Sequence, residues 1–149
     1  MPADSEVTLP HTWRPLGVRL AGAFFGGLLL LVCLVAWFGF DPETRARFSI
    51  FQRGTLVVLG LVAFAAGFAL VRSRVVAEAS RLVVVNGYRR REYEWAEIIA
   101  VHLPPGAPWA VLDLADGTSA PAMGIQGSDG GRARSAVREL RSVIAASSA

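Results

Sequence analysis

The sequence contains no lysine, and this absence changes the meaning of its basic pI. All 15 basic side chains are arginines, against 12 acidic ones, and the formal net charge is +3. Arginine stays protonated at any ordinary pH, so the pI near 10 reflects the kind of base more than its excess. Residues 1–71 carry 5 Arg and 4 acidic residues, and residues 72–149 carry 10 Arg and 8 acidic residues. Neither part has the strong positive charge typical of nucleic-acid binding, and we expect no nucleic-acid partner.

Residues that bind metals or form disulfides are also scarce. The only cysteine, Cys33, lies inside an apolar run, and the two histidines, His11 and His102, belong to different regions. A single cysteine excludes an intrachain disulfide and a cysteine zinc site. We therefore expect no metal site and no cofactor.

Patterns that indicate catalysis are missing as well. The sequence has no HExxH, GxSxG, P-loop or GxGxxG pattern. Asp113 and Asp116 are spaced as turn residues. Gly127–Gly131 (GSDGG) precedes a predicted helix but lacks a following lysine, and Asp129 would repel a phosphate. We expect no catalytic residues and no enzymatic activity.

Two long uncharged runs dominate the first half of the chain. Leu20–Phe40 has 21 residues and Gly54–Val71 has 18. As helices they would extend about 31 Å and 27 Å, which suits the hydrocarbon core of a bilayer. The connection at 41–53 is too short for a domain. A cleaved signal peptide is the disfavoured alternative for the first run, because the run is long and lacks a small-x-small cleavage pattern.

Arginine counts predict the orientation of the two spans. The connection has three arginines, whereas the two ends together have eight close to the spans. This imbalance places both termini in the cytoplasm. The arginine-only, alanine- and glycine-rich composition is typical of a GC-rich bacterial genome, so we expect a multi-pass protein of the bacterial inner membrane. Three aromatic residues lie at or near the predicted membrane interfaces, where aromatic side chains collect: Trp13, Trp37 and Phe51.

The chain is thus predicted to have three parts. Residues 1–19 form a cytoplasmic N-terminal segment, residues 20–71 a two-helix transmembrane hairpin, and residues 72–149 a cytoplasmic domain. Glycines in the spans predict close packing between the chain's own two helices, which we favour over dimerisation. These glycines are Gly22, Gly26, Gly27, Gly60 and Gly67.

Residues 72–149 change to short β-branched runs separated by turn-forming residues. Strands are predicted at 73–79, 81–85, 88–95, 96–103, 109–115 and 118–123. Asn86-Gly87 and Asp116-Gly117 indicate hairpins, and Pro121 indicates an edge or a bulge. Apolar residues at helical spacing from Ala133 to Ile144 predict a final helix, whose start Ser128 or Asp129 can cap. The expected fold is a membrane α-hairpin followed by a small α+β domain, a bent antiparallel sheet with a C-terminal helix.

The order of these motifs resembles a pleckstrin-homology (PH) domain of the bacterial type that follows a two-helix membrane hairpin. The resemblance lies in "SRLVVVNGYRRREYEWAEIIAV", with Leu82 and the W-x-x-I-x-x-V pattern of Trp95, Ile98 and Val101, and then in "LDLADGTSAPAM" and "AVRELRSVI". This order of motifs is similar to that of the family typified by the low-molecular-weight protein antigen 6 of actinobacteria. The resemblance implies a PH-like, non-catalytic domain.

The arginines of 89–91 are the candidate contact residues. Because side chains alternate along a strand, Arg89 and Arg91 share a face with Tyr93, whereas Arg90 lies on the face of Glu92 and Glu94. We predict that Arg89 and Arg91, with Arg81 across the hairpin, contact the membrane or a partner. The alternative is a solvated hairpin whose charges protect an edge strand.

Together these observations predict a membrane-anchored, non-catalytic PH-like binding module at the cytoplasmic face. It would engage a protein partner or the anionic surface of the lipid bilayer. The alternative hypothesis is an accessory subunit of a larger membrane protein complex, which would bind through its transmembrane helices.

Overall fold

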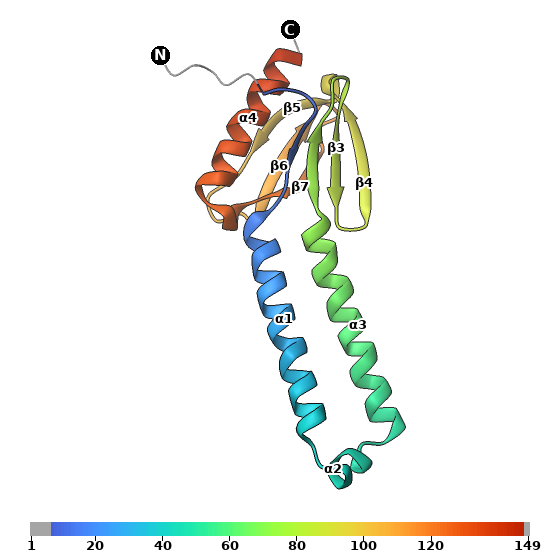
Figure 1. Ribbon diagram of the computed structural model, residues 1–149. Coiled ribbons are helices and arrows are strands. Elements are labelled where there is room, and N and C mark those ends of the chain that lie inside the picture. The colour runs from blue at the N-terminus through green and yellow to red at the C-terminus, as the bar shows by residue number, and fades with distance from the viewer. Residues whose placement is uncertain (1–6, 148–149) are drawn as a thin grey trace.

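Two long helices stand side by side beneath a small β-rich domain in the computed structural model, which describes residues 7–147 (Figure 1). Helix α1 spans Leu16–Gly39 and helix α3 spans Ile50–Arg72, and the short helix α2 (Pro42–Arg47) joins them. Both long helices have the length and apolar composition needed to cross a membrane, and neither is buried by the rest of the chain. The predicted spans are therefore confirmed as helices, each a few residues longer than its uncharged run.

The connection between the long helices is more ordered than a plain loop. The Asp41 carboxylate caps α2 by accepting a hydrogen bond from the Thr44 backbone N–H at 2.8 Å. Ser49 and Gln52 form a reciprocal capping box at the start of α3. These caps explain why the chain reverses direction within so few residues.

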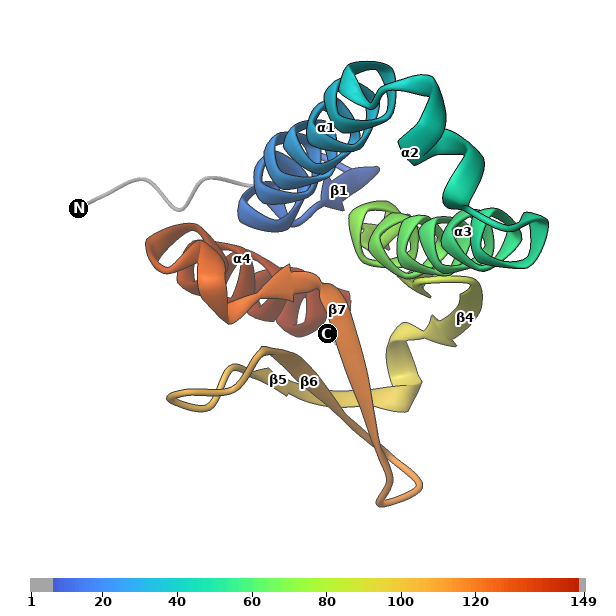
Figure 2. The same ribbon diagram turned by 90° about the horizontal axis from the view of Figure 1, so that it is seen from below.

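The domain consists of two antiparallel sheets and one helix. The first sheet has the order β1-β2-β3-β4, and the second has the order β5-β6-β7. Helix α4 packs against β5 and β7 of the second sheet, as Figure 2 shows. The elements are β1 (His11–Trp13), β2 (Arg74–Ala77), β3 (Arg81–Asn86), β4 (Arg89–Glu94), the 3₁₀ turn η1 (Trp95–Glu97), β5 (Ile98–His102), β6 (Trp109–Leu114), β7 (Ser119–Gln126), the 3₁₀ turn η2 (Gly127–Asp129) and α4 (Gly131–Ser147). The predicted α+β domain with a C-terminal helix is confirmed.

Strand β1 comes from the N-terminal segment, which the sequence did not reveal as part of the domain. It pairs with β2, with Trp13 opposite Val75. The helical hairpin is thus inserted between the first two strands of one sheet. Residues 1–6 of the predicted N-terminal segment lie outside the described residues.

Trp13 lies close to the start of α1, but its ring is buried in the core of the domain and does not face outward. It is 7% exposed, and its Nε1–H donates a hydrogen bond to Glu139 Oε2 on α4 at 2.9 Å. A tryptophan beside a long apolar run is typical of an interface. Here the strand pairing of β1 overrides that tendency.

The two sheets meet where β7 crosses the ends of β2 and β3. The Asn86 side chain donates to the Pro121 carbonyl at 2.6 Å and accepts from the Met123 backbone N–H at 2.9 Å. A Cβ at Gly124 would lie only 2.5 Å from the Arg74 backbone, so the close approach requires glycine there. Pro121 lies on β7, an edge strand of its sheet, as predicted. The core between the sheets and α4 includes Val75, Leu82, Val84, Val101, Leu112 and Leu140.

The β3–β4 turn differs by one residue from its prediction. Asn86 pairs with Arg89, so the turn residues are Gly87 and Tyr88. Gly87 has φ +60° and Tyr88 does not have a positive φ, the pattern of a type II′ turn. Asn86 thereby stays in the strand, where its amide bridges the two sheets.

The predicted packing of α1 against α3 through glycine is largely wrong. Gly22 alone of the five glycines would bring a Cβ close to the other helix, 3.4 Å from Val71. The other four, Gly26, Gly27, Gly60 and Gly67, have no neighbouring heavy atom within 4 Å of that position. The two helices meet instead near α2, where the Arg53 guanidinium of α3 lies 5.4 Å from the centre of the Trp37 ring of α1, and these four small-residue positions stay open.

Candidate functional site

The domain has two ends, of which one carries both long helices. We call it the helix end. It comprises the junctions at 14–16 and 72–74, the β3–β4 turn at 86–89, and the segment at 127–132 (Figure 1). The opposite, far end includes the β2–β3 turn at 78–81. The helix end is the part of the domain that would face a membrane crossed by α1 and α3.

Asp129 joins the domain to the start of α1. Its Oδ1 accepts a hydrogen bond from the Gly17 backbone N–H at 2.7 Å, and its Oδ2 accepts one from the Leu16 N–H at 2.9 Å. Pro15, at the N-cap position, has no side-chain acceptor. The prediction that Asp129 caps the C-terminal helix is therefore wrong, because its carboxylate satisfies the free amides of a different helix.

A second junction holds the β3–β4 turn against the end of α3. The buried Ser73 hydroxyl donates to the Ala69 carbonyl at 3.0 Å and accepts from the Gly87 N–H at 2.9 Å. The Tyr88 hydroxyl donates to the Ala65 carbonyl at 2.8 Å. The Arg72 guanidinium lies 5.4 Å from the centre of the Tyr88 ring. The turn is therefore packed along the side of α3.

The structure brings two of the three predicted contact residues together. Arg89 is directly at the β3–β4 turn, and Arg91 follows two residues later on the same face; both are exposed. Tyr93 is buried on that face, as the alternation predicted. This part of the sequence reasoning agrees with the structure.

Arg81 is placed elsewhere. It lies at the far end, opposite Glu94, and opposed residues of a strand pair project from the same face, which puts it on the face opposite Arg89 and Arg91. It forms ion pairs with Glu78 and Glu92, both at 2.8 Å. The hydrogen bond to Glu78 and then the charge of Glu92 raise the pKa of Arg81. Arg81 is thus a neutralised part of the strand surface.

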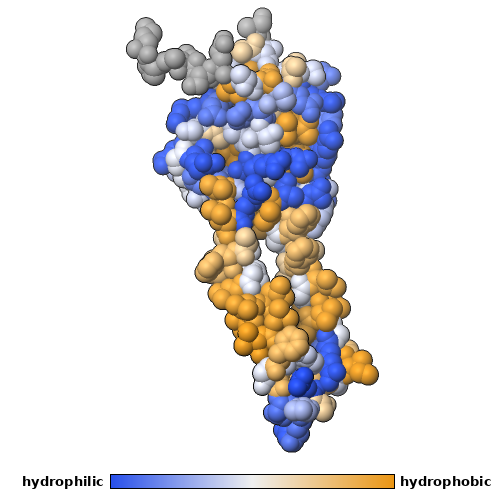
Figure 3. All heavy atoms as spheres, viewed as in Figure 1, coloured by the Kyte–Doolittle hydropathy of each residue, from blue (hydrophilic) through white to orange (hydrophobic). Residues whose placement is uncertain are grey.

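Arginines on the outer face of the β3–β4 hairpin differ in ion pairing from those near the helix end. Arg81 and Arg90 are paired with carboxylates on the outer face of the β3–β4 hairpin. By contrast, a group near the helix end forms neither an ion pair nor a side-chain hydrogen bond with any residue in 7–147. We call this group the arginine collar, and it consists of Arg14, Arg19, Arg72, Arg74, Arg89, Arg91, Arg132 and Arg134. Figure 3 shows a hydrophilic band directly above the apolar helices.

Sequence reasoning missed most of the collar because its members are far apart in the chain. Arg14 and Arg132 come from opposite ends of the sequence and both line one groove. Arginines next to the spans were counted for orientation, but the arginines of α4 gave no such signal. Only the fold places them at the same end of the domain.

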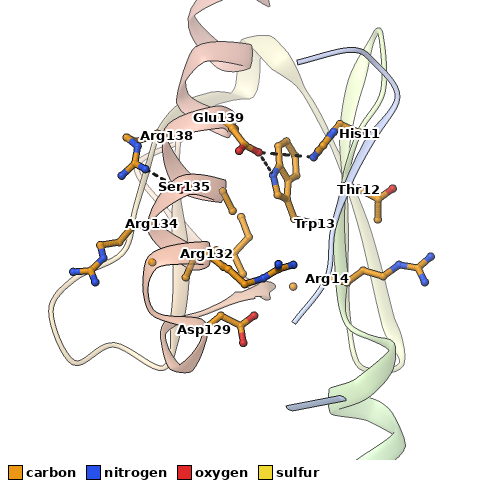
Figure 4. A pocket seen from close by; sticks show the side chains of 15 residues that line it. His11, Thr12, Trp13, Arg14, Asp129, Arg132, Arg134, Ser135, Arg138 and Glu139 are labelled. Atoms are coloured by element: carbon orange, nitrogen blue, oxygen red, sulfur yellow. Dashed lines mark hydrogen bonds and ion pairs between the residues drawn. The ribbon is translucent and has the colours of Figure 1, made fainter. Parts of the chain in front are cut away.

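The groove lies between β1 and the first half of α4, with a volume of about 700 Å³ (Figure 4). Arg132 points into the space between the helix and the strand, whereas Arg134 and Arg138 point outward. The Glu139 carboxylate at the groove accepts a hydrogen bond from Trp13 Nε1–H, and its Oε2 lies 3.8 Å from His11 Nε2. The groove thus offers unpaired positive charge. Among residues 7–147 there is no group of three or more side chains that could hold a metal ion.

Comparison with known proteins agrees with this architecture. Residues 72–142 match the family described as "Bacterial PH domain". The chain is 34% identical over 151 residues to uncharacterized proteins of Mycobacterium tuberculosis (Rv1417) and Mycobacterium bovis (Mb1452), an alignment that covers 97% of this chain and 92% of each relative. No solved structure gave a significant match. The chain belongs to the bacterial PH-domain family, and its fold adds to the matched range a first strand that lies on the other side of the helical hairpin.

Proposed function

We propose that this protein is a membrane-anchored binding module whose arginine collar engages the anionic inner leaflet of the bacterial membrane. Helices α1 and α3 cross the inner membrane, and both termini lie in the cytoplasm. The PH-domain family supports a non-catalytic binding role. The observation that carries the proposal is the division of the arginines, which are unpaired near the helix end and paired on the outer face of the hairpin.

Electrostatics favours this use of the collar. An arginine close to an anionic leaflet gains about 1 kcal/mol, and the attraction fades within a Debye length of about 8 Å. Arg19 and Arg72 belong to the helices themselves, and Arg89 is held beside α3 by the Tyr88 and Ser73 contacts. These side chains are therefore within range of the headgroups whenever the helices are inserted. Because the domain is covalently attached, weak contacts suffice.

The experiment compares two double variants that remove the same charge. Arg89→Gln with Arg91→Gln removes part of the collar, and Arg81→Gln with Arg90→Gln removes two paired arginines of the same hairpin. Each protein is reconstituted in mixed phosphatidylcholine and phosphatidylglycerol, extracted in mild detergent, and its retained lipid is quantified by mass spectrometry. We expect the collar variant to lose retained phosphatidylglycerol, by about thirtyfold if each of the two arginines contributes about 1 kcal/mol.

The matched control should retain phosphatidylglycerol close to the wild-type level, because its arginines are already neutralised. Equal losses in both variants would indicate a general charge effect and would refute a specific role for the collar. No loss in either variant would refute engagement of the leaflet by Arg89 and Arg91.

The open glycine positions of the long helices favour a second candidate function, an accessory subunit of a membrane complex. Gly60 and Gly67 on α3 have no neighbouring atom within 4 Å of a Cβ position, and small residues of this kind let another helix approach closely. Gly60→Leu with Gly67→Leu should then abolish co-purification of a membrane partner, whereas the collar variant should leave it intact. The reverse result favours the leaflet-binding role.

A further inference from the structure

We propose that the β3–β4 turn is inserted into the membrane interface. The Tyr88 ring then lies at the boundary between headgroups and acyl chains. Arg72 is held against that ring and contacts a lipid phosphate. The inference deepens the proposed function and rests on α3 crossing the bilayer. It assigns to the turn a lipid contact that is deeper than a surface attraction of the collar.

The Tyr88 side chain reaches well below the end of α3. Its hydroxyl donates to the carbonyl of Ala65, seven residues before Arg72, the last residue of the helix. At 1.5 Å per residue this point lies about 10 Å below the end of α3. It also lies about 22 Å from Ile50, within the 30 Å that a hydrocarbon core occupies. A bilayer that covers α3 therefore also reaches the Tyr88 side chain.

The β3–β4 turn lies directly against α3. A Cβ at Gly87 would lie 3.2 Å from the Ala69 Cβ, so the turn backbone touches α3 directly. The Ser73 hydroxyl links Gly87 to the same turn of the helix. The turn cannot rise away from the membrane without breaking these hydrogen bonds.

The side chains at this position have the chemistry of a membrane interface. Tyr88 is 60% exposed although it is a large aromatic residue, and tyrosine collects where one side is apolar and the other is wet. The Arg72 guanidinium lies over both the Phe68 ring, at 6.0 Å, and the Tyr88 ring, at 5.4 Å. Phe68 precedes Arg72 by one helical turn, so the Arg72 guanidinium points back along α3 and not away from its end.

Arg72 held in this way matches a lipid phosphate. Its guanidinium has no carboxylate or hydrogen-bond partner among residues 7–147. The two ring faces attract the cation and leave its N–H groups free to donate. A phosphate accepts such donors in a bidentate manner. The Tyr88 ring and the Arg72 guanidinium that lies against it together match the boundary between acyl chains and headgroups.

The test uses the full chain with Cys33→Ala, which leaves no other cysteine. Single cysteines are introduced at Tyr88, at Arg89, at Val62 in the middle of α3, and at Ser80 in the β2–β3 turn of the far end. Each is labelled with bimane and reconstituted in phosphatidylcholine and phosphatidylglycerol vesicles that contain lipid with a nitroxide at acyl carbon 5. Arg89→Cys keeps Tyr88, so it controls for loss of the anchoring ring.

We expect Tyr88→Cys or Arg89→Cys, together with Val62→Cys, to be quenched several-fold more than Ser80→Cys. If Val62→Cys is quenched but neither turn position exceeds Ser80→Cys, the turn stands clear of the lipid and this proposal is overturned, while the membrane anchor holds. If Val62→Cys also matches Ser80→Cys, α3 does not cross the bilayer and the proposed function fails as well.

Discussion

At the scale of single residues, Asp129 carries the connection between the domain and α1. Its two carboxylate oxygens accept hydrogen bonds from amides that lie 112 and 113 residues away in the chain. An acidic group at a helix N-terminus also interacts favourably with the helix dipole. One side chain thus replaces the local cap that Pro15 cannot supply.

Replacing Asp129 should loosen this junction. Asp129→Ala is expected to lower the free energy of unfolding by about 1 kcal/mol, the usual cost of losing an N-cap. It should also accelerate amide exchange at Leu16 and Gly17, measured by hydrogen–deuterium exchange in nanodiscs. Ser128→Ala, at an exposed neighbour, is the control. Unchanged exchange at Leu16 and Gly17 would show that the cap is not maintained in lipid.

Residue types were predictable here, but residue partners were not. The sequence shows that Asp129 can cap a helix, yet it cannot show which helix, because the two segments are joined only by the fold. Alternation correctly placed Arg89, Arg91 and Tyr93 on one face. The same alternation excludes Arg81 from that face, because Arg81 opposes Glu94 and opposed residues of a strand pair project from the same side. The prediction for Arg81 rested only on its place across the hairpin.

At the scale of elements, the unusual feature is the separation of β1 from β2 by the whole helical hairpin. The domain therefore consists of two discontinuous pieces, residues 11–13 and residues 74–147. Trp13 contributes a buried ring to the core and a hydrogen bond to α4. A fragment that begins after α3 lacks an edge strand and one side of the core.

Strand β1 should therefore be required for a stable isolated domain. A fragment of residues 73–147 is expected to give a poorly dispersed NMR spectrum. A version in which residues 7–15 are joined to Ser73 by a short Gly-Ser linker should give a dispersed one, because adjacent strands lie only about 4.8 Å apart. Equal dispersion in both would contradict the prediction.

Within the joined version, Trp13→Ala should cost about 3–5 kcal/mol in urea unfolding, as for other buried aromatic residues. Trp13→Phe keeps most of the ring volume and loses the hydrogen bond to Glu139, so it should cost about 1 kcal/mol. A similar cost for both variants would show that the hydrogen bond, and not the packing, dominates.

Element prediction succeeded where patterns are long or turns are specific. The two helices, the Asp116-Gly117 hairpin and the terminal helix all follow from such signals. Strand β1 was missed because the three residues HTW are too few to show alternation. The apolar run that follows predicts a membrane span and gives no sign of a strand before it. The displaced β3–β4 turn reflects Asn86, whose side chain is needed between the sheets.

At the scale of the whole molecule, the domain and the helical hairpin are joined through Asp129 on one side and through Ser73, Tyr88 and Arg72 on the other. Contacts at both helices restrict rocking about either one. The two helices also contact each other at the end away from the domain, where the Arg53 guanidinium of α3 lies 5.4 Å from the centre of the Trp37 ring of α1. We infer that the domain and the helical hairpin move as one rigid body.

Distance measurements by double electron–electron resonance can check this rigidity. With Cys33→Ala, spin labels at Ala46 in α2 and at Ser80 at the far end should give one narrow distance distribution. Adding Asp129→Ala and Tyr88→Ala should broaden it, because both junctions are weakened. A distribution that is already broad in the otherwise unaltered protein would refute a rigid connection.

The insertion of the hairpin between β1 and β2 also has a consequence for biosynthesis. The ribosome makes β1 first, then both apolar helices, and only afterwards the strand that β1 must join. If just one helix entered the translocon correctly, the two halves of the sheet would emerge in different compartments and Trp13 would never meet Glu139. If α1 and α3 cross the membrane as proposed, the sheet can close only when both helices have been inserted.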